Sequence, residues 1–342
     1  MVTIPTDTNI DALYAKIRAR RAWMYEKEKL SRLCQLKSLP ALAAELYPEQ
    51  GIEGPRQFQK RLVDDHVASL AWILDFLGEP QYGFFLWLLR RYQIENIKVI
   101  FRGFHSRRPA AEVLPYLAAL PEQLAVPAER MLAAPTAHDF AAELEKDPLH
   151  DPVAEAAAAY SEHAKPFHFD ASIDRAFYAT LTSLAEQQEL WEDDRGGELV
   201  SLEATFYLIM LTIRLKAGYR VEFDSVAHYL RIPRTIGLDV LREIYSAQSV
   251  AAGVESLPKR LRGQMPGRID TPDQLERALT MYLYRRADSV FYHSGVALAA
   301  VVAFHYLKRM ELANLIRLVE AYRYGLSAGE MQQSMLPPLE QQ

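Results

Sequence analysis

The sequence predicts an all-α protein, and three observations carry that prediction. Glycine is scarce, with 15 in 342 residues, and no long stretch alternates apolar and polar residues as a half-buried strand would. Capping boxes, the first with proline as its second residue, open two apolar-periodic segments at Thr271-Pro-Asp-Gln274 and Ser327-Ala-Gly-Glu330. Asp224 stands where a third N-cap is expected, ahead of SVAHYL. Proline-rich breaks at 121–135 and 257–272 indicate turns or linkers between groups of helices.

Composition limits the class of protein. The chain is long enough for two or three domains with real cores. A net charge of −5 and a pI near 6.0 argue against a general nucleic-acid binder. A single cysteine, Cys34, excludes an internal disulfide framework and fits a reducing compartment.

Membrane insertion and secretion are not expected from the sequence. The opening residues lack a basic region followed by an apolar one, so no secretory signal is visible. The longest apolar runs, 205–213 and 296–307, fall short of the roughly 18–20 residues that a bilayer span needs. We therefore expect a chain that is soluble by itself.

One pattern recurs at 91–117, 201–230 and 308–336. Each copy is an apolar helix, a basic residue, a glycine-containing turn and a short helix. The basic residues and glycines are Arg102 with Gly103, Arg214 with Gly218, and Arg323 with Gly325. A long amphipathic helix lies upstream of each copy, and short segments such as LPALAAELYP (39–48) and AHDFAAELEKDP (137–148) lie further upstream. The order predicts three helical modules, 1–117, 118–230 and 231–342, although amphipathic helices can also resemble one another by chance.

Catalytic and cofactor motifs are not found in the sequence. It contains neither GxxxxGK[ST] nor GxGxxG, so no nucleotide cradle is visible. The histidines of HAKPFH (163–168), with His150 upstream, match no zinc pattern and are expected on the surface or in loops. Cys34 lies in an apolar helical stretch and is expected in the core. We expect a non-enzymatic chain without cofactor or metal.

Several segments, taken in order, resemble the C subunit of the bacterial and archaeal V/A-type rotary ATPases, called the d subunit in the eukaryotic vacuolar enzyme. Residues 13–48 resemble the N-terminal helix and first short segment of that family. QIENIKVIFRG (93–103) resembles its Asp-x-x-Asn-Leu-Lys…Leu-Arg signature, with Gln93 where an acid is usual. SIDRAFYATL (172–181) resembles its Leu-Asp-x-x-Tyr-Tyr helix, and residues 305–331 its Glu-x-x-Asn-x-x-Arg segment. The second copy departs from the pattern, since it lacks the asparagine.

The resemblance implies a function without catalysis. It implies three small helical bundles around a pseudo-threefold axis, forming a funnel that sits on the ring of membrane-embedded proteolipid subunits and receives the central shaft. Such a chain would serve ion transport, including hydrogen ion transport, from the cytoplasmic side, and would meet the membrane only through the ring. Two alternatives stay open: a helical-repeat adaptor with an exposed concave groove, and an all-α enzyme with a deep pocket. The coupled ion and the direction of the reaction also stay open.

Candidate structural or interface residues come from the recurring pattern and from neighbouring basic pairs. They are Asn96, Arg102, Arg107, Arg108, Arg214, Asn314, Arg317 and Arg323. Asn96 and Asn314 are expected to bond to neighbouring backbone, because a buried amide without a partner costs about 1–3 kcal/mol. Arg102 and Arg317 are expected to cap helix ends or pair with acids. Basic clusters are further candidates for contact with the shaft or ring, or are solvated faces; they comprise Arg18, Arg20 and Arg21, Arg107 and Arg108, and Lys259, Arg260, Arg262 and Arg268.

Overall fold

The all-α prediction is confirmed by the computed structural model, which describes residues 8–49, 51–188, 196–219, 221–265, 267–295 and 297–339. Within these ranges every regular element is a helix and no strand occurs. The chain divides into two compact units. Unit 1 comprises Met1–Glu79, Ala118–Pro121 and Tyr284–Gln342, and unit 2 comprises Pro80–Leu117 and Glu122–Leu283.

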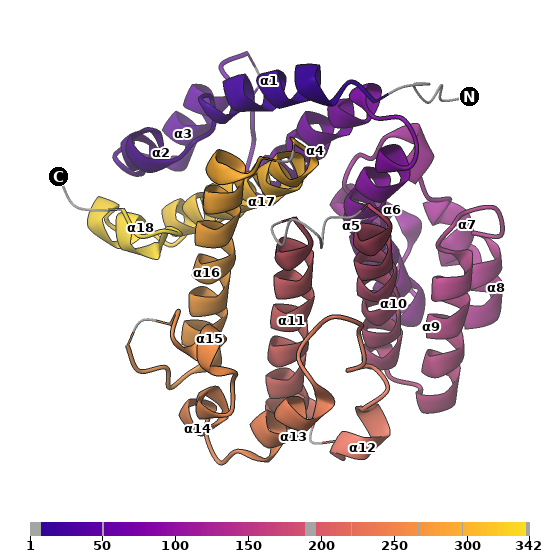
Figure 1. Cartoon of the computed structure of the whole chain (residues 1–342). Coiled ribbons are helices and arrows are strands. Elements are labelled where there is room, and N and C mark those ends of the chain that lie inside the picture. The colour runs from indigo at the N-terminus through magenta and orange to yellow at the C-terminus, as the bar shows by residue number, and fades with distance from the viewer. Residues whose placement is uncertain are drawn as a thin grey trace. The chain divides into compact units, whose positions relative to one another are not determined.

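Unit 1 joins helices from both ends of the sequence. Its elements are α1 (Ile10–Arg21), α2 (Lys27–Cys34), α3 (Leu39–Leu46), α4 (Pro55–Ala71), the 3-10 turn η1 (Trp72–Phe76), the later part of α16 (Pro272–His293), α17 (Ala297–Arg323) and α18 (Ala328–Ser334). The long α17 packs against α1, α3 and α4, and α18 packs against α2 (Figure 1). Indigo and yellow segments therefore share one core.

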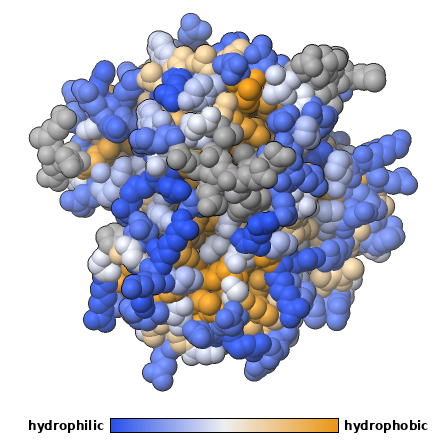
Figure 2. Space-filling view, viewed as in Figure 1, coloured by the Kyte–Doolittle hydropathy of each residue, from blue (hydrophilic) through white to orange (hydrophobic). Residues whose placement is uncertain are grey.

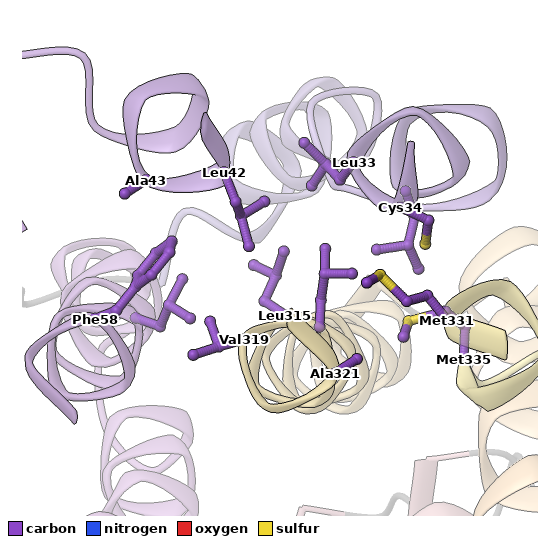
Figure 3. Packing of buried hydrophobic residues seen from close by; sticks show 13 residues of the cluster. Leu33, Cys34, Leu42, Ala43, Phe58, Leu315, Val319, Ala321, Met331 and Met335 are labelled. Atoms are coloured by element: carbon purple, nitrogen blue, oxygen red, sulfur yellow. The ribbon is translucent and has the colours of Figure 1, made fainter. Parts of the chain in front are cut away.

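Apolar side chains from both sets of helices converge in that core (Figure 3). Leu33 and Cys34 of α2 and Phe58 of α4 face Leu315 and Met331, which come from α17 and α18. Cys34 is 1 % exposed, as expected of a core residue, and burial raises the pKa of its thiol to about 11. A thiol so shielded is a packing group, because reactivity requires the thiolate.

Unit 2 is built on three long helices and several short ones. Its long helices are α5 (Gln81–His105), α10 (Pro166–Gln187) and α11 (Gly196–Arg214), to which α9 (His150–His163) and the earlier part of α16 are added. The short elements are α6 (Ala110–Val113), η2 (Leu114–Tyr116), η3 (Glu122–Leu124), α7 (Ala128–Ala133), α8 (Ala137–Ala142), the π turn η4 (Leu215–Tyr219), α12 (Phe223–Val226), α13 (Leu238–Ser246), α14 (Val250–Glu255) and α15 (Lys259–Arg262). Helix α10 packs against α5, α9 and α11, while α7 packs against α5 and α13 against α11.

Helix α11 is apolar on most of its surface. Eleven of its fifteen side chains from Leu199 to Ile213 are apolar, and most of the fifteen are buried. On the face drawn in Figure 2, hydrophilic residues predominate, and hydrophobic ones gather over the lower part of this helix. Despite this apolar character, none of the helices in the described ranges has the length and hydropathy required to cross a bilayer.

The helix starts agree with the sequence except at Asp224. The backbone of Gln274 donates to Thr271 Oγ1 at 3.2 Å, and Ser327 with Glu330 forms a reciprocal capping box. Asp224, expected as an N-cap, instead lies inside α12 and accepts a hydrogen bond from Arg242 at 2.6 Å. That prediction was wrong, because the Asp224 carboxylate accepts from the guanidinium of Arg242 on α13, whereas an N-cap would accept from a backbone amide.

The recurring sequence pattern also predicted a turn at Gly103, and this prediction was wrong. Gly103 lies within α5 and is buried, and a Cβ added there would meet Val113 Cγ2 at 2.6 Å. The glycine thus allows α6 to approach α5 closely. The chain turns instead at Arg107, which has φ 51°, whereas in the third copy Gly325 (φ 69°) occupies the turn as expected.

Candidate functional site

A row of charged residues lines the contact between α5 and α10. The residues on α5 are Arg91, Glu95, Lys98 and Arg102, whose spacing places them on one face of the helix. Opposite them lie Asp170, Asp174 and Tyr178 of α10, with Glu203 of α11 at one end. We call these eight residues the α5–α10 seam. Fully buried charges are rare unless they are paired, and the charged residues of the seam are paired across the helices.

Lys98 is the central residue of the seam. Its side chain is 7 % exposed and forms ion pairs with Asp174 and with Glu95, the latter at 3.2 Å. Burial disfavours the ammonium charge, but the carboxylates of Asp174 and Glu95 outweigh it and raise the pKa of Lys98. Lys98 is therefore held as a cation between two helices.

The two ends of the seam are paired as well. Arg91 donates to Tyr178 Oη at 2.6 Å and to Glu203 at 3.3 Å. At the more exposed end, Arg102 pairs with Asp170 at 2.9 Å, which confirms the expectation that Arg102 binds a nearby acid. Each α5 cation thus has an anion or hydroxyl from a neighbouring helix.

Two sequence motifs meet in this seam. Lys98 and Arg102 belong to QIENIKVIFRG, and Asp174 and Tyr178 belong to SIDRAFYATL. Only Arg102 was among the candidate residues, so sequence reasoning missed the partners. Each motif combines charged residues with apolar ones at helical spacing, which indicated that its charged residues could pair with a neighbouring helix. The sequence alone does not determine which two helices pack against each other.

Gln93 lies in a second polar group on another face of α5. It is fully buried, accepts from Arg90 Nη1 at 2.6 Å and donates from Nε2 to Asp147 Oδ2 at 2.7 Å. Asp147 also pairs with Arg90 at 3.1 Å and accepts from the backbone of Leu149 at 2.8 Å. An amide at position 93 satisfies both neighbours at once, since it can donate to the aspartate and accept from the arginine.

In unit 1, Asn314 bonds to backbone as the sequence predicted. Its Nδ2 donates to the carbonyl of Leu336 at 2.7 Å, and its Oδ1 accepts from the Leu336 amide at 3.0 Å. Asn314 is 3 % exposed. Arg317 donates to the same Oδ1 at 3.4 Å. Asn96 of α5 is likewise buried, at 5 % exposure.

Arg21 was expected in a basic cluster on the surface, and that expectation was wrong. It is 8 % exposed, pairs with Glu26, and pairs with Asp288 of α16 at 2.8 Å. The nearby Glu311 of α17 accepts from the backbone of Tyr25 at 2.6 Å. Arg21 thus connects α1 to α16 within unit 1, because burial of its stem brings the guanidinium to two carboxylates.

The remaining candidates are exposed and do not form one site. Arg107 and Arg108 lie in the turn after α5, where the amides of Arg107 and Arg108 bond to the carbonyls of Phe104 and Gly103. Arg214 pairs with Glu276 at 3.2 Å, and Arg323 with Glu320 at 3.3 Å. Surface pairs of this kind contribute only about 0–1 kcal/mol. The eight candidates are divided between the units, with Asn314, Arg317 and Arg323 in unit 1 and the rest in unit 2.

Two cavities lie outside the seam. One, of about 230 Å³, lies in unit 1 beside His66, Lys308 and Glu311. The other, of about 210 Å³, lies in unit 2 beside Glu198 and Arg260. The parts of the chain that the structure describes hold no group of three potential metal ligands. His168 corrects the expectation of surface histidines, since it is buried against Tyr229, with Nδ1 3.0 Å from the hydroxyl.

Comparison with known proteins agrees with the resemblance. The family described as ATP synthase (C/AC39) subunit matches residues 13–334. The C subunit of the A-type ATP synthase of Halorubrum lacusprofundi is 24 % identical over 96 % of this chain and 98 % of its own length. The C subunit of the A-type ATP synthase of Haloferax volcanii is 23 % identical over 93 % of this chain and 95 % of its own length. The chain therefore belongs to the ATP synthase (C/AC39) subunit family and is a non-catalytic C subunit of the A/V-type ATP synthases.

Proposed function

We propose that this central-stalk subunit is a socket that couples the rotating shaft of an A/V-type ATP synthase to the proteolipid ring. In this proposal the modules 1–117, 118–230 and 231–342 are arranged around a pseudo-threefold axis as a funnel. The chain acts on the cytoplasmic side of the membrane, in ion transport, and performs no chemistry itself. Four sets of observations support it.

The observation that carries the proposal is the shared core of unit 1. Helices α2, α3 and α4 from the first part of the chain pack against α17 and α18 from the last part. An open helical-repeat adaptor keeps its terminal repeats apart, since each repeat contacts only its neighbours. A core built from both terminal segments supports a closed arrangement instead.

The order of elements supports three modules. Prolines occupy the first position of α4, α10 and α16, at Pro55, Pro166 and Pro272. Upstream of each of these helices lies a pair of short helices whose second member has a hydroxyl N-cap, at Ser38, Thr136 and Ser249. Helix α9 follows the second pair and α15 follows the third. The third pair, α13 and α14, was missed in the sequence because it has little identity with LPALAAELYP.

The packing of the short helices supports closure as well. Helix α7 packs against α5, and α13 against α11, so the first member of each pair packs on the long helix that precedes it in the sequence. The pair before α4 has no preceding long helix, and it packs against α17 and α18. The short helices at the beginning of the chain therefore pack against the last long helix and the helix after it, as expected if the modules form a closed ring.

A socket must be stiff, because the energy of ion movement passes through it. Moving one charge against 100 mV requires about 2.3 kcal/mol. The energy of moving several ions per ATP is therefore comparable to the net stability of a domain, roughly 5–15 kcal/mol. The paired charges of the α5–α10 seam fix the register of these two helices, and the buried Asn314 bonds hold α17 to the segment that follows α18.

Affinity purification from detergent-solubilised membranes tests the proposal. The tagged chain is expected to recover shaft subunits together with the proteolipid ring. A matched variant, Leu42→Asp, places a charge in the unit 1 core and should lose both partners if closure is required, whereas the exposed Lys146→Gln should keep them. Recovery of neither partner by the unmodified chain would contradict the socket, and recovery of unrelated proteins would favour the adaptor.

A further inference from the structure

The turn between α1 and α2 carries the most exposed large hydrophobic side chain among the described residues. Trp23 is 79 % exposed. Arg20, Lys27 and Lys29, all exposed, lie on either side of it in the sequence. We call Arg20, Trp23, Lys27 and Lys29 the α1–α2 tip. It belongs neither to the seam nor to the cavities described above.

The tip is built on a fixed backbone. The amide of Trp23 donates to the Arg20 carbonyl at 3.0 Å, and Lys29 Nζ donates to the carbonyl of Ala22 at 2.6 Å. Lys27 begins α2 with φ 47°, in the left-handed region. Below the turn, Met24 is 4 % exposed and anchors it to unit 1. The exposed indole is therefore held outward by an ordered turn.

One cation of the tip lies near the Trp23 indole, and a second packs on a neighbouring tryptophan, Trp72. Lys29 Nζ lies 5.8 Å from the centroid of the Trp23 ring, and the Arg20 guanidinium lies 3.9 Å from the ring of Trp72. Cations at such distances are attracted to the ring face. The tip thus combines an exposed tryptophan with exposed basic side chains.

The charge of this region opposes that of the whole chain. Residues 16–37 have seven exposed basic side chains: Lys16, Arg18, Arg20, Lys27, Lys29, Arg32 and Lys37. The acids of the range are Glu28, which is exposed, and Glu26, which is neutralised by Arg21. The protein as a whole has a net charge of −5. A basic patch on an acidic protein selects an anionic partner.

We propose that the α1–α2 tip binds the anionic headgroups of a lipid bilayer, with Trp23 inserted at the level of the headgroups. Tryptophan is enriched at the membrane–water interface, and adjacent lysines and arginines bind anionic lipid. A single exposed indole on a turn, flanked by cations, fits a deformable lipid surface. This inference rests on the proposed function, which places the chain beside a ring in the membrane, and goes beyond it, since it adds direct lipid contact.

Vesicle sedimentation of the purified full-length chain tests the proposal. One set of vesicles is phosphatidylcholine alone, and the other contains one quarter phosphatidylglycerol. We expect binding to the anionic vesicles that weakens at high salt. The double variant Lys27→Gln/Lys29→Gln should bind roughly 30-fold more weakly, since each cation near an anionic surface contributes a factor of about five. The matched double variant Lys146→Gln/Lys165→Gln changes two exposed lysines of unit 2 and should bind like the unmodified chain.

A second readout isolates the indole. Brominated anionic lipids should quench tryptophan fluorescence of the unmodified chain, and Trp23→Ala should remove that quenching and weaken binding several-fold. The control Tyr324→Ala, at a residue that is 71 % exposed, should change neither. Equal binding to both kinds of vesicle, or equal loss in the control variants, would overturn the proposal. If the unmodified chain binds no vesicles and Trp23→Ala fails to recover shaft or ring subunits in the affinity purification, Trp23 contacts a protein and the lipid proposal is wrong. If Trp23→Ala still recovers the ring, the proposed socket function is unaffected by the result with vesicles.

Discussion

Asn314 bonds to both backbone groups of Leu336, donating to its carbonyl at 2.7 Å and accepting from its amide at 3.0 Å. The side chain of a helical residue thus provides hydrogen-bond partners for the backbone of the bend that follows α18. Because both residues are buried, at 3 % and 1 % exposure, water cannot substitute for the amide.

Replacing Asn314 by leucine should therefore destabilise unit 1. Two buried backbone groups would lose their partner, and each costs about 1–3 kcal/mol, so we expect the free energy of unfolding to fall by about 2–6 kcal/mol. Urea denaturation followed by circular dichroism measures it. Arg323→Gln, at an exposed site in the same helix, should change stability by less than about 0.5 kcal/mol. An unchanged midpoint for Asn314→Leu would show that the paired bonds contribute nothing.

The ion pair between Lys98 and Asp174 should behave as a coupled unit. Lys98→Met alone leaves a buried carboxylate without its main cation and should cost about 3–5 kcal/mol. Lys98→Met combined with Asp174→Leu should recover much of that loss, because the desolvation of both charges is removed. Arg214→Gln, which breaks the exposed pair with Glu276, should cost about 0–1 kcal/mol. Additive losses in the double variant would rule out the coupling.

Gln93→Glu tests the role of the amide at this position. The new carboxylate would lie at hydrogen-bond distance from Asp147, whose Oδ2 is now 2.7 Å from the amide nitrogen. Two buried carboxylates repel, and one is expected to take up a proton. We expect lower stability at pH 8 than in the unmodified chain, with partial recovery near pH 5. Gln93→Met, which adds no charge, should lack this dependence on pH, and a pH-independent Gln93→Glu variant would contradict the explanation.

His66 should make stability depend on pH below neutrality. Burial, with His305, Lys308 and Arg309 nearby, lowers the pKa of His66 well below 6.5, while Asp65 and Glu311 line the adjoining cavity. The folded state therefore keeps the imidazole neutral, whereas the unfolded state binds a proton as pH falls through about 6.5. Unfolding takes up that proton, so stability should fall toward acid by at most about 1.4 kcal/mol per pH unit from this group.

Denaturation at pH 7.5 and 5.5 would measure this term in the unmodified chain and in His66→Phe. The variant should lose less stability on acidification, since it has no proton to bind at this position. His163→Phe changes an exposed histidine and serves as the control. Identical acid sensitivity in all three proteins would show that His66 does not contribute.

The helical class, most helix starts and the family could be predicted from the amino-acid order. Capping boxes and helical periodicity depend on residues a few positions apart, and these interactions form wherever the helix forms. The bonding of Asn314 to backbone could be predicted for a related reason, because a polar amide on the apolar face of a helix must find a partner. The three module boundaries remain predictions.

The pairing of helices, by contrast, depends on long-range packing. Lys98 and Asp174 come from two motifs that each have the pattern of an ordinary amphipathic helix, and their pairing follows from the packing of α5 against α10. Tertiary contacts also explain three predictions that were wrong. Arg21 is buried because it pairs with Asp288, and Asp224 pairs with Arg242 instead of capping a helix. Gly103 lies inside α5, where it allows α6 to pack closely, and not in a turn. In each case the deciding partner is distant in sequence or lies on another helix, so no local pattern specifies it.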